Sequence, residues 1–402
     1  MKQPVLENGA HQAAYRQGID GFPKTVAEYF AGIGLMRLGL ERAGWSIEFA
    51  NDIDPLKREM YSSNFRDTDE HFKLGDIHAL NPKILPQTTL ATASFPCTDL
   101  SLAGARVGLS GPQSSAFWGF IDILKGMGKK RPLLVLIENV TGFLTSSNGS
   151  DFKAALEALN ALGYAVDAFV VDASRFVPQS RQRIFVVGTL CQSNIAESPR
   201  SLGFFESEIR PKALADFIFN NSHIVWKIRT LPKLPVLKEK LESVVEPLAD
   251  SDPDWWNTDR VEYLLSQMSD RHSATAEAMR AHKKWTYGTV FRRVRNGKSM
   301  AELRTDGIAG CLRTPKGGSG RQILFKAGYG RVMVRLLNGR ECARLMGADD
   351  FVIDAPLNQT LFGFGDAVCV PVVTWIALNY LNGVLEELQV VAQSADAPAS
   401  IT

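Results

Sequence analysis

Short runs of β-branched and aliphatic residues alternate with helical patterns over the first 190 residues, and this alternation constrains the fold most strongly. Strands are predicted at 25–30, 47–50, 90–95, 133–137, 165–171 and 184–187, and helices at 35–43, 55–64, 117–126 and 151–162. Ser150 is the expected N-cap of the last helix, and Gly163 is its expected C-cap. Strands that alternate with helices form a mostly parallel sheet covered on both faces, so an α/β domain is predicted.

The alternation stops near Cys191 and returns near Arg335. Between them, Pro, Trp, Gly and basic residues dominate, as in 252–257 and 314–320, and this composition predicts a smaller, irregular second domain. Helical patterns then resume at 339–346 and 368–388. We therefore expect a loose lead-in (1–21), a main domain (22–190), an inserted domain (191–334) and a return to the main domain (335–402).

Charge is distributed unevenly along the chain, although its net value is only +2. The segment 260–331 holds 15 Lys and Arg against 5 Asp and Glu, so the rest of the chain carries a net charge of −8. One basic segment in an acidic chain favours a surface that faces a polyanion. A solvated charged face is the alternative interpretation.

Composition argues against several other classes of protein. No run of 18 or more apolar residues is present, and residues 1–21 have no apolar signal-peptide core, so neither a membrane span nor secretion is predicted. The five cysteines include no CxxC pair, so we expect no disulfide framework and no zinc site. A reducing cytoplasm is the expected environment.

The first predicted strand runs into a glycine-containing turn, Phe30-Ala31-Gly32-Ile33-Gly34, which then opens a helix. Such a turn lets a ligand approach the backbone, but Arg37 stands where the dinucleotide fingerprint has its third glycine. Asp52 and Asp76 follow the second strand and an expected third strand, where open α/β sheets bind ligands. A helix cap or turn is the alternative role for each acid.

Cys97 follows a buried-type strand and opens a loop of small residues that includes Ser101 and Gly104. An accessible thiolate in such a loop is a candidate nucleophile. Many isolated cysteines are inert packing residues, so the interpretation depends on the motifs around it.

Two later segments provide that setting. Glu138 ends an apolar strand, where partial desolvation raises the pKa of a carboxyl group and lets it donate a proton. Gln179, Arg181 and Arg183 have the spacing of one strand face, and two arginines on a half-buried face require an anionic or polarised partner. A glutamate that caps a turn and a plain surface strand are the alternatives.

Together, six segments resemble the C5-cytosine methyltransferase family in the order in which that family carries its motifs. They are Phe30–Gly34 (cofactor loop), Phe95–Cys97 (nucleophile), Glu138–Val140 (ENV), Gln179–Arg183 (QxRxR), Arg335–Gly347 (conserved helix) and Phe364–Val368 (last cofactor motif). The resemblance covers 25–190 and 335–388, and the gap falls where the family has its variable target-recognition domain. The resemblance implies a Rossmann-like fold and an enzyme that uses S-adenosylmethionine (SAM) as its cofactor. It also implies a monomer that acts on duplex DNA.

The resemblance also implies roles for particular residues. Cys97, Glu138, Arg181 and Arg183 are expected to be catalytic. Cofactor contacts are expected from Phe30, Ala31, Gly32, Ile33, Gly34, Asp52, Ile53, Asp76, Ile77, Pro96, Asp366 and Val368. DNA contacts are expected from Ser101, Gln179, Arg313, Lys316, Arg321 and Gln322, and no metal is expected.

Several positions depart from the family pattern. Leu35 replaces a frequent glycine, Thr98 a frequent glutamine and Gln113 a common arginine, while Asp366 replaces a near-invariant asparagine. None of these changes removes the nucleophile or the acid. Leu35 and Asp366 bear on cofactor contacts, and Gln113 on the loop 101–113, which is expected to close over a flipped base.

The resemblance predicts a bacterial, cytoplasmic, DNA-associated modification enzyme of a restriction-modification or related defence system. In the expected reaction, Cys97 attacks cytosine C6, Glu138 donates to N3, and C5 accepts the methyl group. A tRNA methyltransferase, an inactive nucleic-acid-binding protein and a nucleotide-dependent dehydrogenase are the competing interpretations. A partner restriction endonuclease stays an open question.

Overall fold

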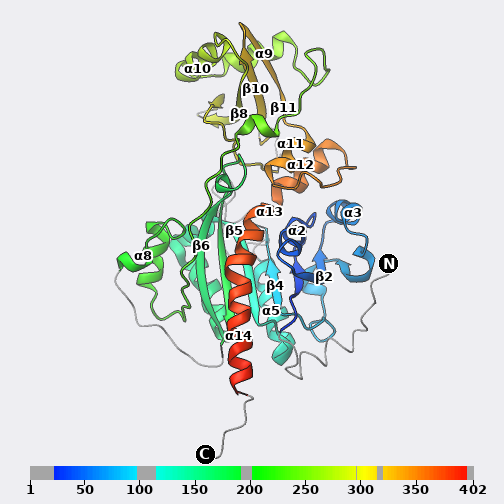
Figure 1. Cartoon of the computed structure of the whole chain (residues 1–402), viewed down its shortest axis with the longest axis vertical. Coiled ribbons are helices and arrows are strands. Elements are labelled where there is room, and N and C mark those ends of the chain that lie inside the picture. Colours follow the sequence, from blue (N-terminus) through cyan, green and yellow to red (C-terminus); the bar gives the residue numbers. More distant parts are fainter. Residues whose placement is uncertain (1–21, 97–114, 192–201, 296, 315–319, 396–402) are drawn as a thin grey trace, which may run out of the picture.

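The computed structural model describes residues 22–96, 115–191, 202–295, 297–314 and 320–395. Figure 1 shows a lower part built around a large sheet and an upper part that stands above it. The chain leaves the lower part, forms the upper part and then returns to the lower part, as expected for an inserted unit.

A seven-stranded sheet forms the lower part, in the order β3-β2-β1-β4-β5-β7-β6. The strands are β1 (Thr25–Tyr29), β2 (Ser46–Asp52), β3 (Phe72–Leu74), β4 (Leu90–Ala93), β5 (Leu134–Val140), β6 (Tyr164–Asp172) and β7 (Gln182–Leu190). Only β7 runs antiparallel to its neighbours, so the predicted mostly parallel α/β sheet is confirmed.

Helices cover both faces of this sheet, as predicted. The helices of the first half are α2 (Leu35–Glu41), α3 (Pro55–Asn64), α4 (Thr68–His71), α5 (Ser115–Met127) and α6 (Ser150–Ala161). Strand β1 is buried on both sides: Val26 packs in one apolar core with α2, and Ala27 packs in a second core with α5 and α6. The N-cap position of α6 is Gly149 rather than Ser150, while Gly163, with φ 88°, lies just beyond its end.

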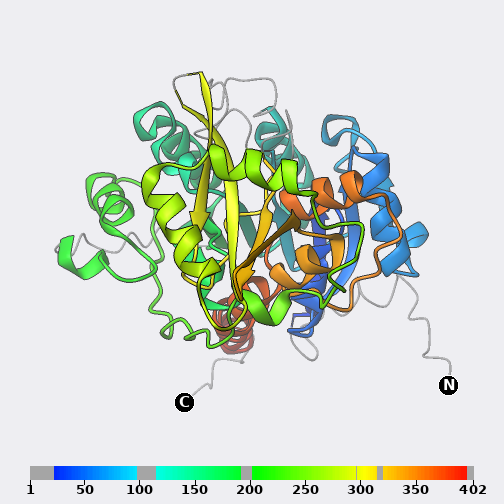
Figure 2. The ribbon, with the colours of Figure 1, turned by 90° about the horizontal axis from the view of Figure 1, so that it is seen from above.

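The upper part contains a four-stranded antiparallel sheet, in the order β11-β10-β8-β9. Its strands are β8 (Thr286–Arg295), β9 (Lys298–Arg304), β10 (Ile323–Gly328) and β11 (Arg331–Leu336), and its helices are α9 (Thr258–Ser266) and α10 (Asp270–Arg280). Alternate apolar residues such as Val290, Leu303 and Phe325 form a separate core beneath the two helices (Figure 2). The domain expected to be irregular therefore contains a regular sheet. Its strands gave no clear alternation in the sequence because successive residues are buried, as in β10 and at 288–290 of β8.

The predicted boundary at 191 does not follow the packing. Helices α7 (Leu202–Phe205) and α8 (Lys212–Asn220) lie against the lower part, where Leu214, Ile218 and Trp226 join the core beside α5 and α6. Trp226 also forms a bridge to Val166 in β6. We place the start of the upper unit after Trp226, and its division from the lower part stays a proposal.

The chain ends in helices that return to the lower part: α11 (Gly339–Leu345), α12 (Leu357–Asp366), α13 (Val370–Ile376), a π-turn (Ala377–Leu381) and α14 (Asn382–Ala395). The run Leu357–Val390 is long and apolar enough to cross a membrane, but 61% of its most apolar window is buried within the protein. Its apolar residues therefore serve the core, and Figure 1 shows α14 lying along the large sheet.

Candidate active site

The turn after β1 requires its glycines. Phe30, Gly32 and Gly34 all adopt positive φ (59°, 58° and 87°), and a Cβ on Gly34 would lie 2.3 Å from the Phe65 ring. A non-glycine residue such as Phe30 is strained in this region, and strained backbone often occurs at ligand sites. The turn therefore brings backbone close to any ligand at the carboxyl end of β1.

Asp52, at the end of β2, holds this turn in place. One carboxylate oxygen accepts a hydrogen bond from Gly32 N at 2.8 Å, and the other accepts one from Asp54 N at 2.9 Å. Burial raises the pKa of Asp52, while Lys57 opposes the rise. Next to it, the Ile53 side chain is 65% exposed at the strand end, where it offers an apolar surface beside the turn.

The other expected cofactor residues lie around the same end of the sheet. The Asp76 side chain accepts a hydrogen bond from His78 N, as in the capping role considered above, and Ile77 is buried. Pro96 is exposed at the end of the segment after β4, and Val368 is buried after α12. The structure brings these elements together but does not test the individual contacts.

Glu28 was not predicted as a site residue. It lies on β1, two residues before the turn, and only 1% of it is exposed. Burial raises the pKa of Glu28 to about 8, with Arg37 acting in the opposite direction. A carboxyl residue inside an otherwise apolar strand was the available sequence signal.

The candidate nucleophile, Cys97, lies outside the described residues, as do Ser101, Gln113 and Lys316. The structure does place the two residues before it. Phe95 is buried, and its carbonyl accepts a hydrogen bond from Asn139 Nδ2 at 3.2 Å. The segment that leads to Cys97 is thus tied to the end of β5.

Glu138 and Arg183 form a buried ion pair beside that tie. Arg183 Nε lies 2.9 Å from Glu138 Oε1, and the side chains are 16% and 7% exposed. Burial raises the pKa of Glu138, although Arg183, Arg181 and a hydrogen bond from Ser94 all lower it. The carboxyl group therefore holds a proton more readily than an exposed glutamate would.

Arg183 lies on β7, whereas Gln179 and Arg181 precede this strand, which begins at Gln182. The prediction that the three side chains share one strand face is therefore wrong. Arg181 is buried and donates to the carbonyls of Leu312, Gly365 and Ala367 at 2.9, 3.1 and 2.5 Å. Its contacts connect segments of the backbone, and Arg183 alone of the two arginines forms an ion pair with Glu138.

Gln179 was expected to contact DNA, and the structure contradicts this. The side chain has no exposed surface; it donates to the Leu345 carbonyl at 2.7 Å and accepts from Leu312 N at 3.0 Å. Both ends of the Gln179 amide are therefore hydrogen-bonded within the protein, as expected of a buried polar side chain.

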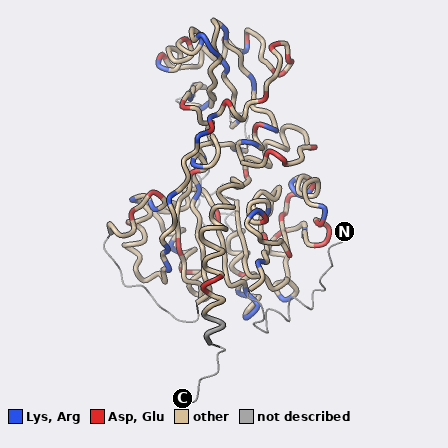
Figure 3. Tube along the Cα trace, viewed as in Figure 1, with Lys and Arg blue, Asp and Glu red and all other residues tan. Residues whose placement is uncertain are grey.

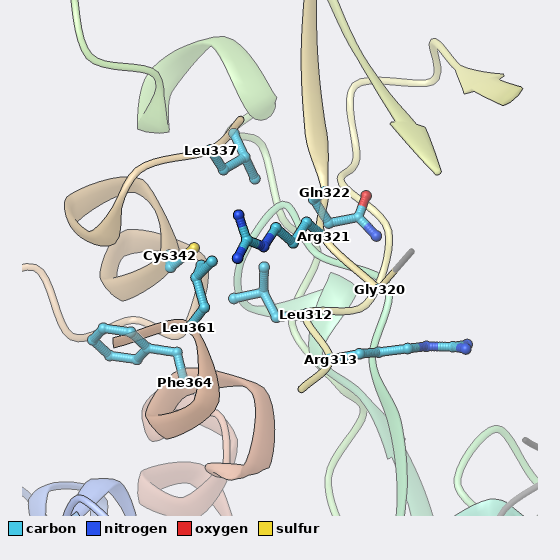
Figure 4. Close-up of a pocket in the computed structure, with 9 residues that line it drawn as sticks. All are labelled: Leu312, Arg313, Gly320, Arg321, Gln322, Leu337, Cys342, Leu361 and Phe364. Carbon is cyan, nitrogen blue, oxygen red and sulfur yellow. The ribbon is translucent and has the colours of Figure 1, made fainter. Parts of the chain in front are cut away.

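Two further expected DNA contacts line a small pocket between α11, α12 and the start of β10 (Figure 4). Gln322 is only 5% exposed and donates to the Cys311 carbonyl, so its predicted role in the groove is also contradicted. Arg321 donates to Asn358 on α12. Arg313 differs from both, since it is exposed and points away from the pocket, with its guanidinium 5.3 Å from the centre of the Phe291 ring.

Asp366 ends α12 and is paired with Lys57 of α3 at 2.7 Å. This contact joins the last motif of the chain to the helix that follows β2 and its Asp52. Within the described part of the chain, no three His, Cys, Asp or Glu side chains are grouped as metal ligands.

The buried Glu138–Arg183 pair, the segment that leads to Cys97 and the glycine turn after β1 fit the residue roles expected of a cytosine-C5 methyltransferase. The model of the C-5 cytosine-specific DNA methylase family matches residues 24–382, and the chain belongs to this family. It is a DNA (cytosine-5) methyltransferase.

Curated relatives match over nearly the whole chain. The type II methyltransferase M.HaeII of Haemophilus aegyptius is 28% identical over 361 residues, which cover 89% of this chain and 93% of the relative. The type II methyltransferase M.HhaI of Haemophilus parahaemolyticus is 28% identical, with 88% and 92% covered. Among solved structures, the S. pombe Dnmt2 methyltransferase has a TM-score of 0.58 at 19% identity, covering 91% of this chain and 99% of that one, and supports the fold.

Proposed function

We propose that the protein transfers a methyl group from SAM to C5 of a cytosine flipped out of duplex DNA, through a covalent bond between Cys97 and C6. One observation carries the assignment of residues: Glu138, which is paired with Arg183 of β7, is followed on β5 by Asn139, and Asn139 holds the segment leading to Cys97. Acid and nucleophile thus share one support.

Each proposed step uses one of these groups. The Cys97 thiolate forms a bond to C6, and Glu138 donates its proton to N3, so that negative charge does not accumulate on the ring. SAM, when bound, supplies an electrophilic methyl group to C5. A base not yet assigned removes the C5 proton, the C5–C6 double bond forms again as Cys97 leaves as a thiolate, and N3 returns its proton to Glu138. Arg183 holds Glu138 and the cytosine carbonyl.

The residues around the glycine turn fit a nucleoside-containing cofactor. Among the described residues, a Cβ on Gly32 would have only the Phe30 carbonyl nearby, at 4.0 Å, so this part of the turn is open. The Asp52 carboxylate and the exposed apolar side chain of Ile53 lie at the same end of the sheet. Asp52 binds the ribose hydroxyl groups and Ile53 packs against the adenine, while Phe30 and the turn hold the methionine part.

The upper part is proposed to bind the target duplex, with Arg313 as a groove contact. Because the base must leave the helix, binding also has to offset an unstacking cost of a few kcal/mol. The relatives named as type II methyltransferases come from bacteria. We propose the same modification role here, for a monomer that acts on DNA in the cytoplasm.

The test is a covalent trap on duplex DNA in which 5-fluorocytosine replaces cytosine. Fluorine does not leave as a proton does, so the protein is expected to stay attached to the DNA on a denaturing gel when SAM is present. Cys97→Ala should abolish the shifted band, and Cys191→Ala is the matched control. An adduct on tRNA but not on DNA would establish a tRNA methyltransferase instead. If no adduct forms on either while DNA still binds, the protein is an inactive nucleic-acid-binding protein.

A further inference from the structure

Two arginines of the upper part share a single tryptophan. The Arg260 guanidinium carbon lies 3.8 Å from the centre of the Trp256 ring, and that of Arg292 lies 5.6 Å from it. Arg260 is on the first turn of α9 and Arg292 is on β8, so residues far apart in sequence bring two cations to one aromatic ring. Cation–π contacts hold guanidinium groups in place without neutralising them.

Neither cation has an acidic partner within ion-pair distance in the described part of the chain. Arg280, Arg293 and Arg304, in contrast, are paired with Glu277, Glu302 and Asp306. Burial lowers the pKa of Arg260, and the neighbouring positive charge of Arg292 lowers it further. Two like charges held together without a counter-ion make a site that an anion would stabilise.

The tryptophan is fixed by the sheet. Trp256 N donates to the Val334 carbonyl of β11 at 2.8 Å, and its half-buried indole packs against the core of the upper part. Both guanidinium groups therefore rest on a rigid base, and little side-chain entropy is lost when they bind a ligand.

Strand register places the site at the end of the upper sheet nearest the lower part. Ile323, the first residue of β10, pairs with Val290 of β8 and with Leu336, the last residue of β11. Arg292 lies two residues beyond Val290, past the point where the chain enters and leaves the upper part. Figure 3 shows Lys and Arg positions gathered on the upper strands.

We propose that Arg260 and Arg292, supported by Trp256, form a binding site for a backbone phosphate of the target duplex. A phosphate diester carries the single charge and the accessible oxygens that two converging guanidinium groups bind. The site holds the duplex without reading its sequence, and this inference rests on the proposed action on DNA.

The experiment measures the affinity of the Arg260→Gln and Arg292→Gln variants for a mixed-sequence duplex across a salt series. Each variant should bind roughly tenfold more weakly at low salt, as for one charged hydrogen bond. The slope of log K against log salt should fall by about one, the value expected for the loss of one phosphate contact. The loss of affinity should be equal for a duplex that contains the target sequence, identified from the covalent trap, and for a duplex that lacks it.

Arg280→Gln is the matched control, because Arg280 lies on the neighbouring helix and is paired with Glu277. Arg260→Lys, which keeps the charge, should retain the wild-type slope. An unchanged slope in both Gln variants, or a loss confined to the target sequence, would overturn the proposal. If the wild-type protein itself neither binds nor traps duplex DNA, the proposed function fails first, and that result is separate from a defect seen only in the variants.

Discussion

Lys57 Nζ lies 2.7 Å from Asp366 and so joins the first turn of α3 to the last residue of α12. Coulombic attraction to Asp366, and also to Asp52 and Asp54, raises the pKa of Lys57 against the effect of its burial. A cation therefore sits among the carboxylates at the proposed cofactor pocket. The negative charge of Asp366, which stands where the family usually has asparagine, is thus paired with the positive charge of Lys57.

Lys57→Met should raise the KM for SAM roughly tenfold, because an unpaired Asp366 and Asp52 are left beside the pocket. Adding Asp366→Asn to Lys57→Met should restore most of the affinity, since the second carboxylate is then neutral. Steady-state kinetics at saturating DNA measure both, with Lys129→Met as an exposed control. Equal losses in the single and double variants would show that the pair has no such role.

Glu138→Gln should lower kcat by about 10²–10⁴ while duplex binding persists, because the amide keeps the shape but cannot donate the proton. The raised pKa of Glu138 means that the protonated form extends to higher pH than for an exposed glutamate. Single-turnover rates should therefore decline as pH rises through the pKa of Glu138 in the folded protein. A rate in Glu138→Gln equal to that of the wild type would rule out this acid.

Arg181 and Arg183 should separate stability from chemistry. Arg181→Met leaves three buried carbonyls without their donor, and we expect the free energy of unfolding to fall by about 2–4 kcal/mol. Arg183→Met should instead reduce kcat with a smaller change in stability, since it removes the ion pair with the acid rather than the donor of three buried carbonyls. Urea denaturation and turnover of both variants test this contrast.

Glu28 should make stability depend on pH. Its pKa in the folded protein is about 8, above the ordinary value of 4.5, so its stabilising contribution is complete below about pH 4.5. That contribution is lost as pH rises toward 8, because the buried carboxyl must then ionise or the chain must unfold. Glu28→Gln should show a flatter profile of unfolding free energy between pH 5 and 8 than the wild type. Parallel profiles would contradict the assignment.

Arg313→Gln should weaken duplex binding or alter sequence preference, because its exposed guanidinium beside Phe291 is free to reach DNA. Gln322→Ala should leave the sequence preference unchanged, since the buried amide is bonded inside the protein. Competition binding with target and non-target duplexes compares them. A shift in preference in Gln322→Ala, with none in Arg313→Gln, would reverse the two roles.

The sequence predicted the α/β sheet well because its strands are buried on both faces and read as continuous apolar runs, as in β4 and β5. Glu138 and the turn at Gly32 were found because their chemistry follows directly from their place at strand ends. Gln179 and Gln322 were misplaced because polarity alone does not distinguish a DNA contact from a satisfied buried amide. The partner of Asp366 was also unpredictable, because Lys57 lies 309 residues away and only the tertiary fold brings the two together.

The joint between the two parts of the molecule combines a shared apolar core with hydrogen bonds to main-chain atoms. Leu241, Val244 and Leu312 of the upper part pack in the same core as Leu345 of the lower part. Arg181 and Gln179 both bind backbone atoms of Leu312. These two hydrogen bonds do not depend on which side chain stands at position 312, so the recognition side can change its sequence there while the catalytic part keeps Arg181 and Gln179.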